Sequence, residues 1–289
     1  INSEIFKAPE VELEGYDALS HEKKIEMDRH RVAWNISQFL HGEQGALLVA
    51  SQLVSCAPTF NAKMYAASQT FDEARHVEGF NRYLKEKIGF QYPATKGLKS
   101  LMDKILTDER WDLKFIGMQI IIEGLALAAF NNMKFILNDG LLKQLLHYVI
   151  RDEARHVTFG VNYLEDYLKT LSKSEIEERA EFAFEACLVM RGRLISGEVV
   201  AKFLDYTPEE ADRIAFESDQ GQNFRTLLFT KIVPNLKRIG LLTDNVKEKY
   251  EQIGVLSYAE LEDNFNIDWA EMSKPYETQE EIEKAIRLV

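Results

Sequence analysis

The chain has 289 residues, of which 46% are hydrophobic and 28% charged, and its formal net charge is −12. This composition indicates an ordinary globular protein, and the negative charge argues against nucleic acid or an anionic membrane as a main partner. The two cysteines, Cys56 and Cys187, are far apart and form no CxxC pair. We therefore expect no disulfide framework, no signal peptide and a cytoplasmic location.

The first half of the chain is predicted to begin with an irregular arm over residues 1–18. Ser20 is placed to cap a long helix that runs to about Cys56 and ends before Pro58. A second long helix is predicted over residues 60–87. A loop with the sequence GFQYPATKG comes next, and residues 98–106 are expected to form a short connecting helix.

A third long helix is predicted over residues 108–138, and its apolar run from Phe115 to Leu137 is interrupted by polar side chains such as Gln119. We interpret this run as a buried helix and not as a membrane span. Asn-Asp-Gly at residues 138–140 predicts a turn, and a fourth helix is expected over residues 141–171.

The remainder of the chain also has a helical pattern. Ser174 and Glu177 are spaced as a capping box for a helix that reaches Phe203. Pro208 is predicted to open another helix, and a further one over residues 225–239 is expected to be broken or kinked at Pro234.

Strand-like alternation is scarce, so the predicted class is all-α, with one helical domain over residues 1–289. Within it we expect a four-helix bundle of two repeats (20–171), accessory helices (172–260) and a polar tail (261–289).

The most informative feature is a six-residue repeat, DEARHV, which occurs at residues 72–77 and again at 152–157. Residues three apart share one face of a helix. Each copy therefore presents a glutamate and a histidine together: Glu73 with His76, and Glu153 with His156.

Thirty residues before each of these glutamates stands another one inside an apolar helical run, Glu43 and Glu123. A pair of Glu-x-x-His motifs with one further Glu for each is the ligand set of a carboxylate-bridged di-metal site in a four-helix bundle. A lone ExxH is usually a solvated helix surface, but buried carboxylates need a compensating charge. The sequence thus predicts six metal ligands, which also form the catalytic site: Glu43, Glu73, His76, Glu123, Glu153 and His156.

Within this set, Glu73 and Glu153 are predicted to bridge the two ions, while Glu43 and Glu123 bind one ion each. Asp72 and Asp152 precede the bridging residues, and we expect each to support a histidine of the opposite helix pair without binding metal. Arg75 and Arg155 either balance these aspartates or lie exposed on the outer face.

Apolar residues on or beside the ligand faces are candidates for a substrate pocket or, equally, for ordinary core. They are Phe39, Ala46, Phe80, Ile120, Leu127 and Gly160. Gly42 and Gly45 flank Glu43. Two explanations for these glycines have equal weight: close helix packing, or room beside a metal ion.

Four glutamates and two histidines suit iron or manganese better than zinc, so two Fe ions are predicted, with Mn/Fe as an alternative. The doubled pattern resembles the ferritin-like di-iron carboxylate superfamily over about residues 20–170. Within it the chain is similar to the oxygen-activating branch: the ribonucleotide reductase small subunit, the ligand-binding oxidases that resemble it, acyl-carrier-protein desaturases and arylamine N-oxygenases.

Two positions depart from these relatives. The reductase subunit usually has Asp as its first ligand and a radical-forming Tyr four residues after the first histidine, where this chain has Glu43 and Phe80. The N-oxygenases have an extra histidine four residues before the last ligand glutamate, where this chain has Val149. The nearby His147 is predicted to lie off the ligand face.

The resemblance implies an O₂-dependent oxidoreductase, such as a monooxygenase, that hydroxylates, N-oxygenates or desaturates a small or acyl-type substrate. A radical-generating subunit for a partner enzyme is the alternative, and iron storage or ferroxidation is a third reading. We expect an external electron-donor protein and a homodimer.

Overall fold

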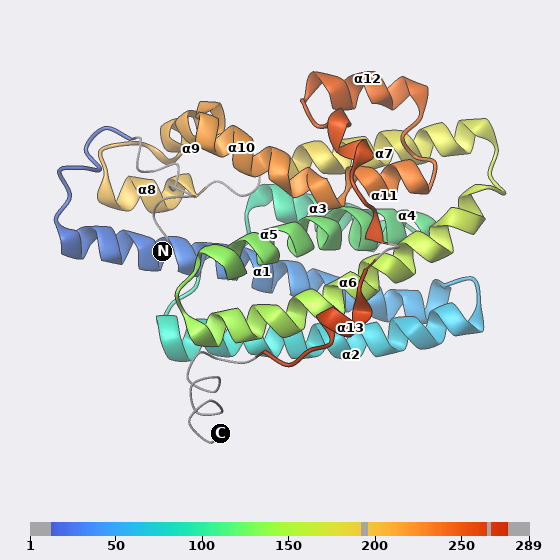
Figure 1. The fold of residues 1–289 in the computed structure, drawn as a ribbon, viewed down its shortest axis with the longest axis horizontal. Helices are drawn as coiled ribbons and strands as arrows, with labels where there is room; N and C mark the ends of the chain where they lie inside the picture. The colour runs from blue at the N-terminus through green and yellow to red at the C-terminus, as the bar shows by residue number, and fades with distance from the viewer. Residues whose placement is uncertain (1–12, 192–195, 265–266, 277–289) are drawn as a thin grey trace.

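The fold is all-helical. The computed structural model describes residues 13–191, 196–264 and 267–276, and this part of the chain contains no β-strand. The predicted all-α class is therefore confirmed. Four helices run along the molecule (Figure 1), namely α1 (His21–Cys56), α2 (Phe60–Tyr83), α5 (Glu123–Ile136) and α6 (Gly140–Leu168).

Helices α1 and α2 begin and end where the sequence predicts. The Ser20 side chain accepts a hydrogen bond from the backbone N–H of Lys23, which satisfies one of the free donors at the start of α1. Thr59 caps α2 in the same way. Helix α1 ends at Cys56, two residues before Pro58, and packs along α2. The short segment η2 (Leu84–Ile88) continues α2 as a π-helix.

The third long helix contains a change of geometry that the sequence did not predict. It runs from Trp111 to Ile136, but between α4 (Trp111–Phe115) and α5 lies a π-helical segment, η3 (Ile116–Ile122). A π-helix has wider turns than an α-helix and frequently occurs at functional sites. Glu123 is the first residue after it.

This helix is long and apolar enough to cross a membrane by length and composition alone. However, 94% of its most apolar window is buried inside the molecule. A buried interior helix explains the hydrophobic run, as its interrupting polar residues predicted.

Helix α6 comes after a short turn and lies beside α5. Asp139 caps it, because its carboxylate accepts a hydrogen bond of 2.7 Å from the backbone N–H of Leu142. The connection between α5 and α6 therefore comprises residues 137–139, close to the predicted turn at 138–140, and Gly140 is already the first residue of α6. A shorter helix, α3 (Lys96–Thr107), lies in the connection between the α1–α2 pair and the α5–α6 pair, and it contacts α1.

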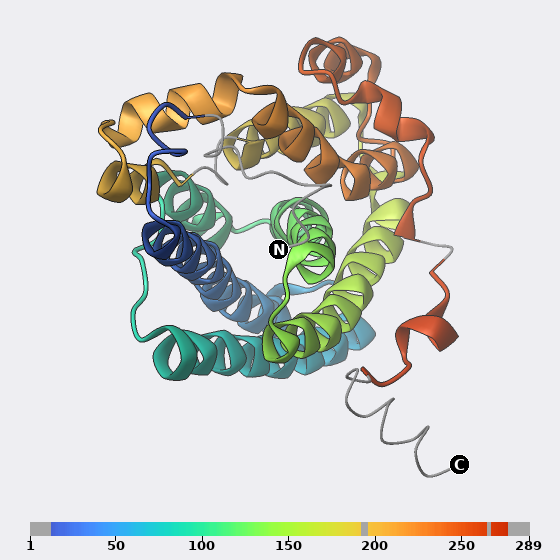
Figure 2. The same cartoon turned by 60° about the vertical axis from the view of Figure 1, so that its left-hand side comes forward.

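The remaining helices are α7 (Lys173–Arg191), α8 (Gly197–Phe203), α9 (Pro208–Glu217), α10 (Asp219–Leu228), η4 (Phe229–Lys231), α11 (Val233–Arg238), α12 (Asp244–Gln252), η5 (Leu256–Glu260) and α13 (Trp269–Met272). Through α7, α8, α10 and η4 they cover the side of the molecule formed by α1, α3, η3 and α5 (Figure 2). Helix α13 lies away from this side, near α6. Thr207 and Glu210 form a capping box at α9, whose first residue is Pro208 as predicted.

One prediction in this region was wrong by two residues. The capping box before α7 is formed by Ser172 and Glu175, two residues earlier than predicted, with Ser172 N–H donating to the Glu175 carboxylate at 2.8 Å. The helix expected over residues 225–239 is broken close to Pro234, as predicted. The break lies at Ile232, and Pro234 is in the first turn of α11, where its missing N–H removes no helical hydrogen bond. Residues 1–12 of the predicted arm (1–18) and residues 277–289 of the predicted tail (261–289) lie outside the described residues.

Candidate metal centre

All six predicted ligands lie in one buried cluster. Each is 5% exposed or less. Helix α1 carries Glu43, α5 begins with Glu123, and the Glu-x-x-His pairs lie on α2 and α6. The sequence pattern therefore brings together side chains that are separated by up to 113 positions, from Glu43 to His156. We call Glu43 with His76 the first half-site, and Glu123 with His156 the second half-site.

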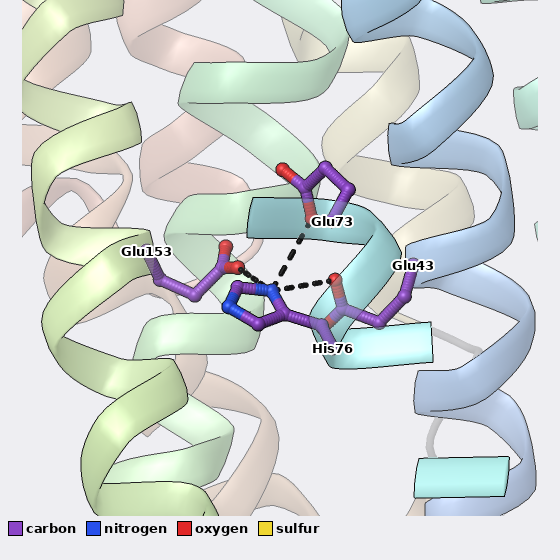
Figure 3. Close-up of side chains that lie close together, drawn as sticks. All are labelled: Glu43, Glu73, His76 and Glu153. Carbon is purple, nitrogen blue, oxygen red and sulfur yellow. Dashed lines mark hydrogen bonds and ion pairs between the residues drawn. The ribbon is translucent and has the colours of Figure 1, made fainter. Parts of the chain in front are cut away.

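The first half-site is centred on the Nδ1 atom of His76. Carboxylate oxygens of Glu43, Glu73 and Glu153 each lie 3.3 Å from this nitrogen (Figure 3). Ligand atoms around a cation with bonds of about 2.1 Å are roughly 3 Å apart in octahedral geometry. The four side chains thus have the spacing of a coordination sphere, and they form a group that can hold a metal ion.

The second half-site is arranged around the Nδ1 atom of His156. A Glu73 oxygen lies 3.2 Å away and a Glu153 oxygen 3.8 Å away. Glu73, Glu123 and His156 form a second group whose ligand atoms lie within 4.8 Å of one another. Glu73 belongs to both groups, so the two half-sites are adjacent and share a carboxylate.

Several polar atoms of the cluster make no hydrogen bond within the described part of the chain. These buried atoms are Glu73 Oε2, Glu123 Oε2, Glu153 Oε1 and His156 Nδ1. Buried polar atoms are nearly always satisfied, because leaving one unpaired costs about 1–3 kcal/mol. Cations bound between these atoms would satisfy all of them, and a donor set of oxygen and imidazole nitrogen suits iron or manganese. The residues therefore fit a metal centre.

The charges of the cluster also indicate a missing compensating group. Burial, and then the negative charge of Glu153, raises the pKa of Glu43 and of Glu123 well above the usual range. Burial by itself would lower the pKa of His76, but the facing Glu43 carboxylate raises it well above 6.5. In the same way Glu73 raises the pKa of His156. Without cations, protons must neutralise this cluster.

Asp72 and Asp152 each contact the histidine of the opposite helix pair, as predicted. The Nε2 atom of His76 lies 3.2 Å from Asp152 Oδ2, and that of His156 lies 3.3 Å from Asp72 Oδ2. Because Nε2 is engaged in this way, Nδ1 of each ring faces the carboxylates of the cluster. A carboxylate behind a histidine fixes its tautomer and orientation for metal binding.

Two arginines complete the arrangement behind the histidines. Arg75 donates to Asp72 at 2.5 Å and to Asp152 at 2.9 Å, and Arg155 donates to Asp152 at 2.7 Å and to Asp72 at 3.3 Å. The four side chains form a closed ring that joins α2 to α6. The side chains of Arg75 and Arg155 are also 45% and 40% exposed. Each arginine therefore balances the aspartates and also lies at the outer face, so the two alternatives are combined.

The sequence pattern did not reveal a buried amide beside the ligands. The Gln69 side chain is fully buried, and its Nε2 donates to Glu73 at 3.1 Å and to Glu123 at 2.8 Å. Behind it, Gln119 Nε2 donates to Gln69 Oε1 at 3.3 Å. The sequence did contain one indication of this role: Gln69 lies four residues before Glu73 and therefore on the same helix face.

A small cavity of about 20 Å³ opens beside the carboxylates, between α1 and α5. Of the six predicted pocket residues, Phe39 and Ala46 line it. The other lining residues are Gly42, Glu43, Ile122, Glu123, Leu125, Ala126, Phe130 and Glu153. This volume holds about one water-sized molecule.

The other four candidates do not line this cavity, which agrees with ordinary core, the second of the two alternatives for these positions. Phe80, Ile120 and Leu127 are buried in the core. A Cβ atom on Gly160 would lie 2.5 Å from the Cβ of Gln119, so this glycine allows close helix packing.

The two glycines that flank Glu43 have different roles. One leaves open space beside the cluster, and the other allows close helix packing. Gly42 lines the cavity. At Gly45 a Cβ atom would lie 2.1 Å from the end of the Met102 side chain on α3, so this position allows helix contact. His147, a rejected ligand candidate, instead contacts Lys134 and the carbonyl of Lys274.

A scan against models of known protein families finds none that matches this chain. A search of curated proteins finds no match either. The strongest indication of function is therefore the site itself: two adjacent groups of buried carboxylate and imidazole ligands, on four helices, that can hold metal ions.

Proposed function

We propose that this protein is an O₂-activating, non-haem di-iron oxidase or oxygenase with a ferritin-like four-helix bundle made of α1, α2, α5 and α6. One observation carries the proposal: the two ligand groups share Glu73 inside a buried interior, and four of their atoms make no hydrogen bond in the described structure. This matches the ligand arrangement of carboxylate-bridged di-metal proteins, in which each of the four helices contributes.

In this proposal Glu73 and Glu153 would contribute to holding both ions. Glu43 and His76 of the first half-site would hold one ion, and Glu123 and His156 of the second half-site the other. Iron bound there would supply electrons for the reduction of O₂. The protein's own contribution is to hold the carboxylates at fixed spacing, to orient both imidazoles through Asp72 and Asp152, and to exclude bulk water from the interior.

The cavity between α1 and α5 supports O₂ as the reactant. It is about 20 Å³, and apolar side chains such as Phe39, Ala46 and Phe130 line it together with three of the ligand carboxylates. Pockets for organic ligands usually measure about 300–1,000 Å³. A small or acyl-type substrate would therefore enter only when side chains next to this cavity move, and the reaction with it is a hydroxylation, an N-oxygenation or a desaturation.

The radical-generating alternative receives less support from the residues around the site. Phe80, four residues after His76, is fully buried, and its ring lies 6.4 Å from that of Phe39 and 5.8 Å from that of Phe130. A phenyl ring has no hydroxyl proton to lose, so this position provides no tyrosyl radical.

The remaining features of the proposal concern partners. Within the described residues both cysteines are free thiols, and neither is paired for an iron–sulfur cluster. Electrons would then come from a separate donor protein. We also propose a homodimer and a cytoplasmic location, as expected from the sequence.

The test is to load the metal-free protein with Fe(II) without oxygen and to mix it with O₂ in a stopped-flow instrument. We expect two irons per chain and rapid O₂ consumption. Ala46→Val would narrow the cavity and slow the reaction with O₂ at unchanged iron content. Ala183→Val, at a buried position on α7, is the matched control for core overpacking.

Two outcomes would count against the proposal. Iron uptake that continues well beyond two per chain as more iron is added would favour storage. A protein that binds two irons but consumes no O₂ would exclude the oxidase.

A further inference from the structure

The buried amide of Gln69 contacts the two half-sites unequally. Its Nε2 donates to Oε1 of Glu123 at 2.8 Å and to Oε1 of the shared Glu73 at 3.1 Å. Ionised carboxylates only accept hydrogen bonds, so the nitrogen of the amide must face them. The amide oxygen then faces Gln119, whose Nε2 donates to it at 3.3 Å. Both side chains are fully buried, and the orientation of Gln69 is fixed from both sides.

No equivalent amide supports Glu43. The repeat has an offset of 80, so the position that corresponds to Gln69 is Val149 on α6. Within the described structure, the hydrogen bond made by Glu43 is with Nδ1 of His76, at 3.3 Å. That nitrogen faces the proposed ion, so a bound ion would replace this hydrogen bond. Within the described residues Glu43 would then have no protein donor to hold it, whereas Glu123, which also borders the cavity, keeps its hydrogen bond from Gln69.

The side chains that surround the two half-sites also differ. The repeat aligns Phe39 with Gln119 and Phe80 with Gly160. Gln119 fits only because residue 160 is glycine, since a Cβ atom there would lie 2.5 Å from the Cβ of Gln119. In the first repeat two phenyl rings occupy the corresponding positions. The second half-site therefore has amides behind its carboxylate, whereas the first has phenyl rings, and the cavity borders Glu43 and Glu123 alike.

We propose that Gln69 is a positioning residue that makes the second half-site the tighter of the two, so that it takes up metal first. The inference rests on the proposed metal centre. The amide holds Oε1 of Glu123 and leaves Oε2, which makes no hydrogen bond, directed to the ion. A ligand held in place before binding loses less conformational freedom when the ion arrives. The free Glu43 carboxylate of the first half-site can change its position beside the cavity.

The test is a titration of the metal-free protein with Mn(II) under anaerobic conditions, monitored by isothermal calorimetry and by electron paramagnetic resonance of the free ion. We expect two binding steps of different affinity in the wild-type protein. Glu123→Gln should remove the tight step, and Glu43→Gln should remove the weak one.

Gln69→Leu keeps a similar volume and removes the amide. It should weaken the tight step by about 10- to 100-fold, the usual effect of losing a supporting group behind a metal ligand, while the weak step changes by less than about threefold. Val149→Leu, at the matching position of the second repeat, is the control and should leave the order of the steps unchanged. Circular dichroism of the metal-free variants checks their folding, and the two glutamate variants test the order of filling even if Gln69→Leu does not fold.

Two equal steps in the wild-type protein, or loss of the tight step in Glu43→Gln, would overturn this inference and leave the proposed function standing. Two unequal steps without any reaction with O₂ would support the inference and contradict the proposed function. No metal uptake at all would overturn both.

Discussion

The Oδ2 atom of Asp152 lies 3.2 Å from Nε2 of His76, although the two residues belong to different copies of the repeat. The same contact recurs between Asp72 and His156 at 3.3 Å. Each copy of the DEARHV motif thus supplies the carboxylate that orients the histidine of the other copy. The two motifs form one unit, and neither completes its own half-site.

Replacing either aspartate should therefore impair the site without abolishing it. Asp72→Asn and Asp152→Asn keep the size of the side chain but remove the charge that makes the histidine a better ligand. We expect about 10- to 100-fold weaker metal binding or slower reaction with O₂, measured by stopped-flow absorbance of the iron-loaded variants. Asp166→Asn, at a side chain that is 89% exposed, is the control. Wild-type rates in both site variants would show that the contacts have no role in the chemistry.

Metal stoichiometry is the most direct prediction. Elemental analysis after anaerobic iron loading should give two ions per chain in the wild-type protein. Glu123→Ala should lower this ratio, because it removes a ligand of the second half-site. The matched surface variant is Glu86→Ala, whose side chain is 54% exposed and pairs with Arg82, and it should bind as much iron as the wild type. A folded wild-type protein without metal would contradict the whole interpretation of the site.

Oxidation of the reduced, iron-loaded protein by O₂ should leave no long-lived tyrosyl radical. Phe80 occupies the position one turn after His76, and it is packed against Phe39 and Phe130. Electron paramagnetic resonance at low temperature is the measurement. An intense and persistent tyrosyl signal would instead favour the radical-generating subunit, and Tyr83→Phe and Tyr163→Phe would then locate it.

The metal-free protein should lose stability as pH rises above about 6.5. A histidine whose pKa is higher in the folded state than the ordinary value of 6.5 contributes stability below that pH. The contribution disappears as pH rises through the raised values of His76 and His156. Melting temperatures between about pH 6.5 and 9 should therefore fall without metal, and Mn(II) should remove most of the fall, because the ions replace the protons. A melting temperature that rises over this range in the metal-free protein would contradict the charge arrangement.

Gly160→Ala should destabilise the protein by about 1–3 kcal/mol, the usual cost of overpacking. The new methyl group would lie 2.5 Å from the Cβ of Gln119, an atom next to the backbone that cannot move away alone. Gly140→Ala is the control, since a Cβ atom there meets nothing within 4 Å. Urea unfolding of the metal-free proteins gives the comparison. Equal stability of the two variants would mean that η3 and α6 can separate locally without cost.

The sequence was sufficient to predict the helices that carry the candidate ligands and the contact of each aspartate with the histidine of the other repeat, because the repeat, the cap at Ser20 and the spacing of charged residues can be read directly from it. It did not indicate the π-helix before Glu123. Residues 116–122 contain no proline to mark a break, and their apolar pattern is equally compatible with an α-helix.

The start of α7 shows why a correct motif can be placed wrongly. Ser172 with Glu175 and Ser174 with Glu177 are both possible capping boxes, two residues apart. The structure uses the first, and Glu177 instead accepts a 2.7 Å hydrogen bond from Thr243. The choice depends on a contact 66 residues away, which local sequence cannot reveal. Gln69 was missed for a similar reason, because its partner Glu123 lies on another helix.

The exchange of aspartates between the two motifs has a consequence for biosynthesis. A chain leaving the ribosome exposes Glu43, Glu73 and His76 first, and these could already attract an ion. The carboxylate that orients His76 is made 76 residues later, at Asp152. A nascent chain that ends before α6 therefore offers an ion only poorly oriented ligands. We expect stable metal loading to occur after the synthesis and docking of α6, so that an incomplete chain does not retain a redox-active ion.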